Sequence, residues 1–362
     1  MRPYRIDVPQ AELDEVKARL ARTRFAGDLP GAGDDYGVSV EAVKLLADHW
    51  QHRFDWRALE ARLNAYPQFT TEIDGQNVHF FHIRSANPDA LPLVLTHGWP
   101  GTVLEYLDVI EPLSRDFHLV LPSVPGFGFS GPTTERGWGA ERVARAWAEL
   151  MARLGYERYG ALGNDGGSIV TPFIGRVDPE HAVALHVTQI FSFPSGDPAE
   201  FAGMSEEELG KVRFLQWFWE NMGAYDKMQS QAPMTLAHAI TDSPAGLLGW
   251  MGQLMGAELG LDWVVGNIAI HWFFGTAASS ARFYYENAKA AQPTEPTTVP
   301  IGLANFKNDF QSIRRFAERD HRAIAQWNFY DVGGHYASHE VPDVFAADVR
   351  AFFTDFGRAA AS

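Results

Sequence analysis

The sequence predicts an α/β protein with a mostly parallel, doubly wound sheet, a helical cap and an N-terminal helical extension. Three observations support this fold class. Short apolar runs alternate with helical patterns between residues 91 and 190, which is typical of buried parallel strands joined by helices. The alternation then gives way to an aromatic-rich helical stretch over about 200–290, and two further strands follow it. A helical segment also precedes the first strands.

The N-terminal segment shows helical periodicity followed by a hairpin signal. Residues 10–22 place apolar side chains on one helical face, and residues 38–66 predict two more helices, with Ser39 as a possible N-cap. Asp74-Gly75 then separates two β-rich runs, which predicts a tight hairpin.

The strands of the predicted sheet fall into two groups. Four buried strands are expected over 91–97, 117–125, 159–164 and 182–190, and two more over 300–306 and 327–334. A helical insertion between two halves of one sheet predicts a cap over the carboxyl edge, where open α/β sheets bind ligands. The expected division is an N-terminal extension (1–75), a first core half (76–195), the cap (196–295) and a second core half (296–362).

The amino-acid composition excludes several classes of function and of partner. The 362 residues carry a formal net charge of −15, so nucleic acid is not an expected partner. The chain has no cysteine, which excludes disulfides and thiol catalysis. It shows neither a signal peptide nor a run of 18 apolar residues, so we expect a cytoplasmic protein without a membrane anchor. No motif indicates a cofactor, and a homo-oligomer is left open.

One glycine-flanked turn carries the strongest chemical signal. Residues 163–167 read Gly-Asn-Asp-Gly-Gly, the layout of a strand-to-helix nucleophile elbow with Asp165 where serine is usual. Taken alone, Asp165 is equally well interpreted as the N-cap of the following helix. The stretch "THGWPG" (96–101) ends an earlier strand, so the backbone N–H of Trp99 is expected to join that of Gly166 in stabilising an anionic intermediate.

Two later residues complete the expected order of nucleophile, acid and histidine. Asp309 follows the strand over 300–306, although it could equally cap the next helix, and His335 follows two glycines after the last strand. His339 lies four residues further on, which raises the alternative of a metal pair. Because the glutamate of a HExxH helix is absent, we interpret His339 as an ordinary structural histidine and expect no metal.

An aspartate nucleophile suits a saturated carbon. It would leave an ester that water can cleave, whereas a serine would leave a stable ether. An ordinary Asp, with a pKa of ~3.9, is already ionised at neutral pH, so the histidine is free to activate water in a second step. The departing oxygen needs an acid donor, and a tyrosine in an apolar cap would serve.

The chain resembles the microsomal-type epoxide hydrolases of the α/β-hydrolase superfamily over nearly its whole length. The resemblance rests on residues 8–25 and 55–85, on "HGWPG", "PGFGFSGP", "SSARFYYEN" and "GGHYASHEVP", and on the aspartate elbow. It implies that Asp165 is the nucleophile, Asp309 the charge-relay acid and His335 the base. It also implies that Tyr225 and Tyr284 polarise the epoxide, with the adjacent Tyr285 as an alternative to the latter.

The implied reaction converts an apolar epoxide, with aromatic epoxides included, and water to a vicinal diol through an aspartyl ester. The sequence departs from the family pattern at Gly166, where tryptophan is usual, at Thr102, where serine is common, and at Asp309, which is a glutamate in some members. A haloalkane dehalogenase and a catalytically silent ligand-binding homologue are the alternatives.

Overall fold

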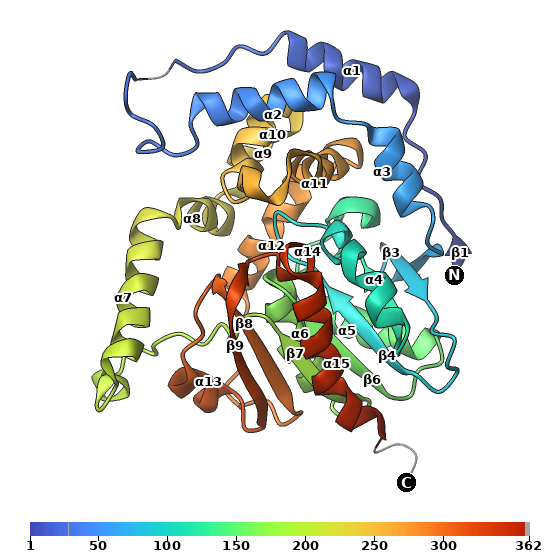
Figure 1. Ribbon diagram of the computed structural model, residues 1–362, viewed down its shortest axis with the longest axis vertical. Helices are drawn as coiled ribbons and strands as arrows, with labels where there is room; N and C mark the ends of the chain where they lie inside the picture. The colour runs from blue at the N-terminus through green and yellow to red at the C-terminus, as the bar shows by residue number, and fades with distance from the viewer. Residues whose placement is uncertain (28, 359–362) are drawn as a thin grey trace.

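A single mixed sheet organises the computed structural model, which describes residues 1–27 and 29–358 (Figure 1). Within these residues the sheet has nine strands in the order β1-β2-β3-β5-β4-β6-β7-β8-β9. The strands are β1 (Arg2–Pro3), β2 (Gln68–Ile73), β3 (Gln76–Ile83), β4 (Leu91–Thr96), β5 (Phe117–Pro122), β6 (Tyr159–Gly163), β7 (Ala182–Val187), β8 (Ile301–Asn308) and β9 (Ile324–Gly334). All pairings from β5 through β9 are parallel, whereas β1, β2 and β3 form an antiparallel edge. The predicted fold class is confirmed.

The parallel strands in the middle of the sheet are largely apolar because helices cover both faces of the sheet. Every residue of β5 and β6 is buried, as expected for strands covered on two sides. Helices α4 (Leu107–Ser114) and α15 (Pro342–Arg358) pack together on one face, and α5 (Ala140–Arg153) and α6 (Gly166–Val177) pack together on the other (Figure 1).

The predicted hairpin at Asp74-Gly75 is present. Both residues have positive φ, 50° and 73°, which suits a two-residue turn between β2 and β3. Because both strands belong to the central sheet, the expected division at residue 75 falls within the sheet.

A helical cap is inserted between β7 and β8, above the carboxyl ends of the strands. It comprises α7 (Glu206–Asn221), α8 (Ala224–Gln231), α9 (Pro233–Asp242), α10 (Pro244–Gly252), α11 (Leu261–Phe273) and α12 (Ala277–Lys289). The first of these begins with a capping box, in which Ser205 Oγ accepts from Glu208 N at 3.2 Å and Glu208 Oε2 accepts from Ser205 N at 2.8 Å. Helix α7 extends away from the rest of the cap (Figure 1).

The N-terminal extension packs on the cap more than on the sheet. It contains α1 (Gln10–Ala21), α2 (Val40–His52) and α3 (Trp56–Leu63), and α2 contacts α10 and α11 (Figure 1). Ser39 caps α2 as predicted, since its hydroxyl accepts from Ala42 N at 3.4 Å.

Short helices complete the fold near the loops. They are η1 (Val103–Tyr106), η2 (Gly128–Ser130), η3 (Pro198–Phe201), η4 (Ala257–Leu259), α13 (Arg314–Asp320) and α14 (Ala337–Glu340). Helix α13 has Ile313 as its N-cap, so Asp309 does not cap that helix. Across residues 1–27 and 29–358, no helix has the length and apolar character needed to cross a membrane.

Candidate active site

The strand-to-helix elbow holds Asp165 in a backbone conformation that few residues adopt. Strand β6 ends at Gly163, α6 begins at Gly166, and Asp165 between them has φ 53° and ψ −118°. A methyl group on Gly163 would collide with the Gly167 carbonyl, and one on Gly167 would collide with the Thr96 carbonyl. Only glycine therefore fits at these two positions. Such strain costs about 1–3 kcal/mol and persists where the surrounding structure enforces it.

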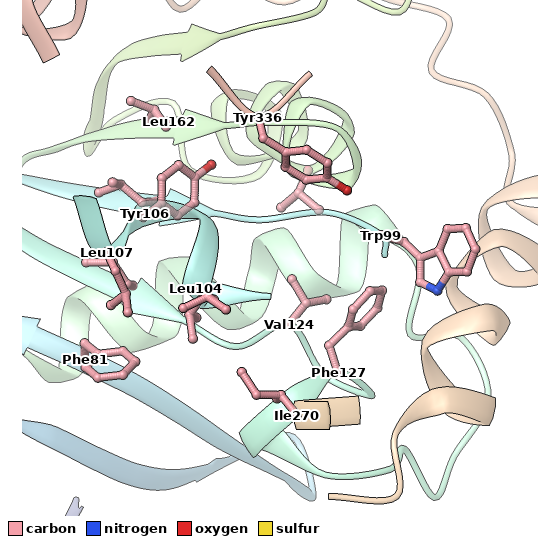
Figure 2. Close-up of a cluster of buried hydrophobic side chains, with 14 of the residues drawn as sticks. Phe81, Trp99, Leu104, Tyr106, Leu107, Val124, Phe127, Leu162, Ile270 and Tyr336 are labelled. Atoms are coloured by element: carbon pink, nitrogen blue, oxygen red, sulfur yellow. The ribbon is translucent and has the colours of Figure 1, made fainter. Parts of the chain in front are cut away.

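Two backbone donors converge on one oxygen of Asp165. Asp165 Oδ1 accepts from Trp99 N at 2.9 Å and from Gly166 N at 2.6 Å. An ordinary N-cap side chain accepts instead from the second or third helical N–H. The structure thus brings together the two predicted oxyanion donors, although Trp99 lies 66 residues before Asp165 in the chain. Figure 2 shows the Trp99 indole pointing away from the sheet toward the cap helices.

The predicted acid and histidine lie on the other side of the same carboxylate. His335 Nδ1 is 2.8 Å from Asp309 Oδ1, and His335 Nε2 is 3.5 Å from Asp165 Oδ2. The side chain of Asp309 is 3 % exposed, whereas those of Asp165 and His335 are 19 % and 32 % exposed. The acid is therefore hidden behind the imidazole, while the nucleophile and the imidazole remain accessible to a small molecule.

The charges in this cluster set the resting protonation state. Burial by itself would lower the pKa of His335, but the Asp309 and Asp165 carboxylates raise it to about 10. Burial raises the pKa of Asp165 above its ordinary value, against the opposing effects of His335 and of the Trp99 and Gly166 N–H groups. The ordinary pKa expected from sequence therefore does not apply in the fold. The positive imidazolium of His335 and the Asp165 carboxylate stabilise each other.

Gln189 joins the nucleophile to the acid, and sequence reasoning missed it. Gln189 Oε1 accepts from Asp165 N at 2.8 Å, and Gln189 Nε2 donates to Asp309 Oδ2. The side chain is fully buried. In the sequence, the available signal was the polar pair Thr188-Gln189 near the end of the strand expected over 182–190. No motif distinguishes this pair.

Two cap tyrosines face the nucleophile from above. The Trp99 ring stacks on Tyr225 of α8, with centroids 5.7 Å apart, and meets Tyr284 of α12 edge-on, also at 5.7 Å. Within the described part of the chain, neither tyrosine hydroxyl has a hydrogen-bond partner. Burial and the nearby Asp165 charge raise the pKa of both phenols, so both are donors at neutral pH.

Of the two adjacent tyrosines in α12, the structure places Tyr284 at the site. Tyr285 is 38 % exposed, and the Lys289 ammonium lies over its ring at 5.6 Å. Consecutive helical residues point in directions about 100° apart, so the two side chains cannot share one site.

Gly166 leaves space that a cap residue fills. A methyl group on Gly166 would lie 3.3 Å from Phe283 Cε1 and 3.3 Å from Gly98 Cα. Phe283 therefore supplies an aromatic surface over the position where the family pattern led us to expect a tryptophan.

His339 belongs to a structural network. Its Nδ1 is 2.6 Å from Asp108 Oδ2, its Nε2 is 3.0 Å from the Leu259 carbonyl oxygen, and its ring stacks on Trp263 at 4.7 Å. Both ring nitrogens are thus engaged by the protein. Among residues 1–27 and 29–358, no cluster of three or more histidine and carboxylate side chains could hold a metal ion.

Comparisons with known proteins agree with this architecture. Residues 1–106 match the family described as "Epoxide hydrolase N terminus", and residues 92–233 match "alpha/beta hydrolase fold". The chain is 37 % identical to the protein named "Putative epoxide hydrolase" from Stigmatella aurantiaca, over 97 % of this chain and 84 % of that protein. It superposes on Aspergillus niger epoxide hydrolase with a TM-score of 0.88 and 28 % identity, covering 98 % of this chain and 96 % of the other. It superposes on the juvenile hormone epoxide hydrolase of the silkworm Bombyx mori with a TM-score of 0.89 and 26 % identity, covering 99 % of this chain and 95 % of the other.

Proposed function

Because the chain belongs to the microsomal-type epoxide hydrolase family of the α/β-hydrolase superfamily, and is by homology an epoxide hydrolase, we propose that it opens an apolar epoxide through a covalent ester on Asp165. The observation that carries this mechanism is the position of the Asp165 carboxylate. One oxygen accepts from two backbone N–H groups, and the other faces His335 at 3.5 Å.

In the first step, Asp165 Oδ2 attacks a ring carbon of the epoxide. The ring C–O bond breaks, and the departing oxygen takes a proton from the Tyr225 or Tyr284 hydroxyl. Both phenols keep their protons at neutral pH, and no acceptor among the described residues competes for them. General-acid assistance of this kind is worth about 10²–10⁴ in rate.

The first step prepares the second by changing a charge. Esterification removes the Asp165 carboxylate, one of the groups that raise the pKa of His335. The imidazolium then passes its proton, through solvent, to the tyrosinate left by the first step, and the neutral imidazole accepts a proton from water. The water oxygen attacks the Asp165 carboxyl carbon, and the Trp99 and Gly166 N–H groups stabilise the oxyanion. As the acyl C–O bond breaks, the departing alkoxide takes the proton from His335 and leaves as the diol, and the new Asp165 carboxyl group returns its proton to His335. Asp309 orients the imidazole and stabilises its charged form.

The aromatic side chains of the cap and of the Trp99 loop favour an apolar substrate. The ring surfaces of Trp99 and Phe283 lie beside the nucleophile. Aromatic and aliphatic walls with a few fixed polar groups are typical of pockets for apolar small molecules.

A haloalkane dehalogenase would use the same nucleophile. One observation favours it: the Trp99 indole N–H is buried without a partner among the described residues, and an indole N–H can hold a halide. The Tyr225 and Tyr284 hydroxyls favour an oxygen leaving group instead. Halide release from bromoalkanes without diol formation from epoxides would reverse this preference.

The deciding experiment traps the ester. His335→Gln should still form the adduct and then stall, so intact-protein mass spectrometry with an aryl epoxide should show the substrate mass added at Asp165. Wild-type enzyme in heavy-oxygen water should release, in one turnover, a diol whose new oxygen is light. A diol that carries the solvent isotope in that turnover would contradict the covalent route.

The tyrosines provide a matched comparison within one helix. Tyr284→Phe should slow ester formation about 10²-fold or more, whereas the exposed Tyr285→Phe should leave it within about threefold. Equal effects of the two substitutions would exclude a specific role for Tyr284.

A further inference from the structure

A buried carboxyl group beside the triad has no role in the steps above. Glu105 lies in η1, four residues after the Gly101 corner, and is fully buried. Neither carboxyl oxygen has a hydrogen-bond partner among the described residues. Buried polar groups are normally paired with protein or ordered water, so an isolated carboxyl group calls for a ligand.

The position of this carboxyl group is defined by its neighbours. A methyl group on Gly101 would lie 2.8 Å from Glu105 Oε2 and 3.4 Å from the Tyr336 ring. The carboxyl group therefore sits beneath the loop that carries Trp99 and next to the residue that follows His335. Burial raises the pKa of Glu105 well above its ordinary value, against the Tyr106 hydroxyl, the His335 charge and the Asn164 amide. A neutral carboxyl group can both donate and accept a hydrogen bond.

Asn164, next to the nucleophile, presents a complementary unpaired donor. Asn164 Oδ1 accepts from Thr188 Oγ1 at 2.6 Å and from Gln189 Nε2 at 2.9 Å, which fixes the orientation of the amide. Its Nδ2 is buried and has no partner in the described residues. The hydroxyl of Tyr336 is likewise buried and unpaired. Besides burial, Asn164, His335 and Asp165 all influence the pKa of Glu105, and Glu105 influences that of Tyr336, so these groups are neighbours.

We propose that Glu105, together with the Asn164 amide, holds the water molecule that is consumed in ester hydrolysis. A buried water typically makes about three hydrogen bonds to polar groups that would otherwise be unsatisfied. Here Glu105 and Asn164 supply two, and His335 Nε2 accepts the third once Asp165 is esterified. Glu105 is then a positioning residue: it does not bond to the substrate, and it acts by fixing the attacking oxygen. The proposal rests on the ester mechanism above.

A purely structural role for the side chain is disfavoured. The Glu105 carbonyl accepts from Ser338 Oγ at 2.8 Å, which links η1 to the loop after His335. On the Glu105 side this bond involves only the backbone carbonyl, so substitutions of the Glu105 side chain leave it in place. For packing alone, an apolar residue of similar size would avoid the cost of burying an unpaired carboxyl group.

The test separates ester formation from ester hydrolysis. Glu105→Gln, Glu105→Met and the exposed control Glu111→Gln are mixed with an aryl epoxide, and rapid quench with intact-protein mass spectrometry follows the adduct. For Glu105→Met we expect ester formation within about threefold of wild type and hydrolysis slowed about 10²-fold, the effect of misplacing a reacting group. Glu105→Gln keeps a donor and an acceptor but alters their arrangement around the water, so its hydrolysis should be slowed by only about five- to tenfold. Glu111→Gln should match wild type in both steps.

Each other outcome is decisive. Hydrolysis within threefold of wild type in Glu105→Met, or equal slowing of both steps, would overturn the proposal. If Glu105→Met does not fold, Glu105→Gln decides alone: hydrolysis slowed at least fivefold with normal ester formation supports the proposal, and unchanged hydrolysis refutes it. If His335→Gln accumulates no adduct, the ester mechanism itself fails, independently of Glu105.

Discussion

Replacing Gln189 with methionine tests whether the nucleophile and the acid are held by one side chain. Methionine has nearly the same length and fills the same buried space without hydrogen-bonding capacity. The substitution removes the bond from Asp165 N to Gln189 Oε1, at 2.8 Å, and the bond from Gln189 Nε2 to Asp309 Oδ2. It also removes the bonds that Gln189 makes with Asn164 Oδ1 and Ser168 Oγ. Asp165 loses only a bond to its backbone, whereas Asp309 loses a bond to its carboxylate.

The expected size of the effect follows from the two bonds that Gln189 makes with Asp165 N and with the Asp309 carboxylate. A hydrogen bond to a charged acceptor contributes about 1.5–3 kcal/mol, and a buried N–H left unsatisfied costs about 1–3 kcal/mol. Because one side chain makes both bonds, the two losses overlap, and we expect a total of about 3 kcal/mol. Part should appear in the free energy of unfolding, since the strained φ of Asp165 loses its anchor. The remainder should appear as a kcat lowered about 10- to 100-fold, at 1.36 kcal/mol per factor of ten.

Urea unfolding and steady-state diol formation from an aryl epoxide measure these two effects. Ser168→Ala is the matched control, because Ser168 Oγ donates to Gln189 Oε1 at 2.9 Å but contacts no member of the triad. It should cost no more than about 1 kcal/mol of stability and leave kcat within about threefold. If Gln189→Met also keeps kcat within threefold and stability within about 0.5 kcal/mol, Gln189 does not hold the site together.

Three further predictions concern packing and protonation. Asp348→Asn should lower the free energy of unfolding by about 3–5 kcal/mol in urea melts, because it disrupts a buried pair with His186 at 2.6 Å; a loss below 1 kcal/mol would contradict this. Gly166→Trp should lose about 1–3 kcal/mol through overpacking against Phe283, and adding Phe283→Ala should restore part of it. Stability should also fall as pH drops below about 6.5, because burial depresses the pKa of five histidines that the unfolded chain protonates near that value. At pH 5.5, unfolding should therefore take up about four protons through these side chains, and a pH-dependence of urea stability that indicates fewer than two would refute the assignment. The five are His79 and His97, with pKa about 3, and His82, His271 and His321, with pKa about 4.

Local patterns in the sequence were sufficient for the fold class and for locating the chemistry. Apolar runs that alternate with helical periodicity specify a covered parallel sheet wherever they occur, and the hairpin at Asp74-Gly75 follows from two adjacent residues. The Asp165 elbow is equally local, because its glycines are required by contacts within a few residues and with the neighbouring strand. Chain order then selected Asp309 and His335, which the structure brings together.

Tertiary structure alone decided how those residues are supported. Gln189 meets Asp309 across 120 positions of the chain, and no local pattern records such a contact. The choice of Tyr284 over Tyr285 depends on the rotation of α12 above the sheet, and the pKa of His335 depends on carboxylates from separate strands. Periodicity reports which face of an element is buried. Contact partners and local electric fields arise only when those faces meet. The support of Asp165 by Gln189, the burial of the Glu105 carboxyl group and the charge on His335 could therefore be seen only in the tertiary structure.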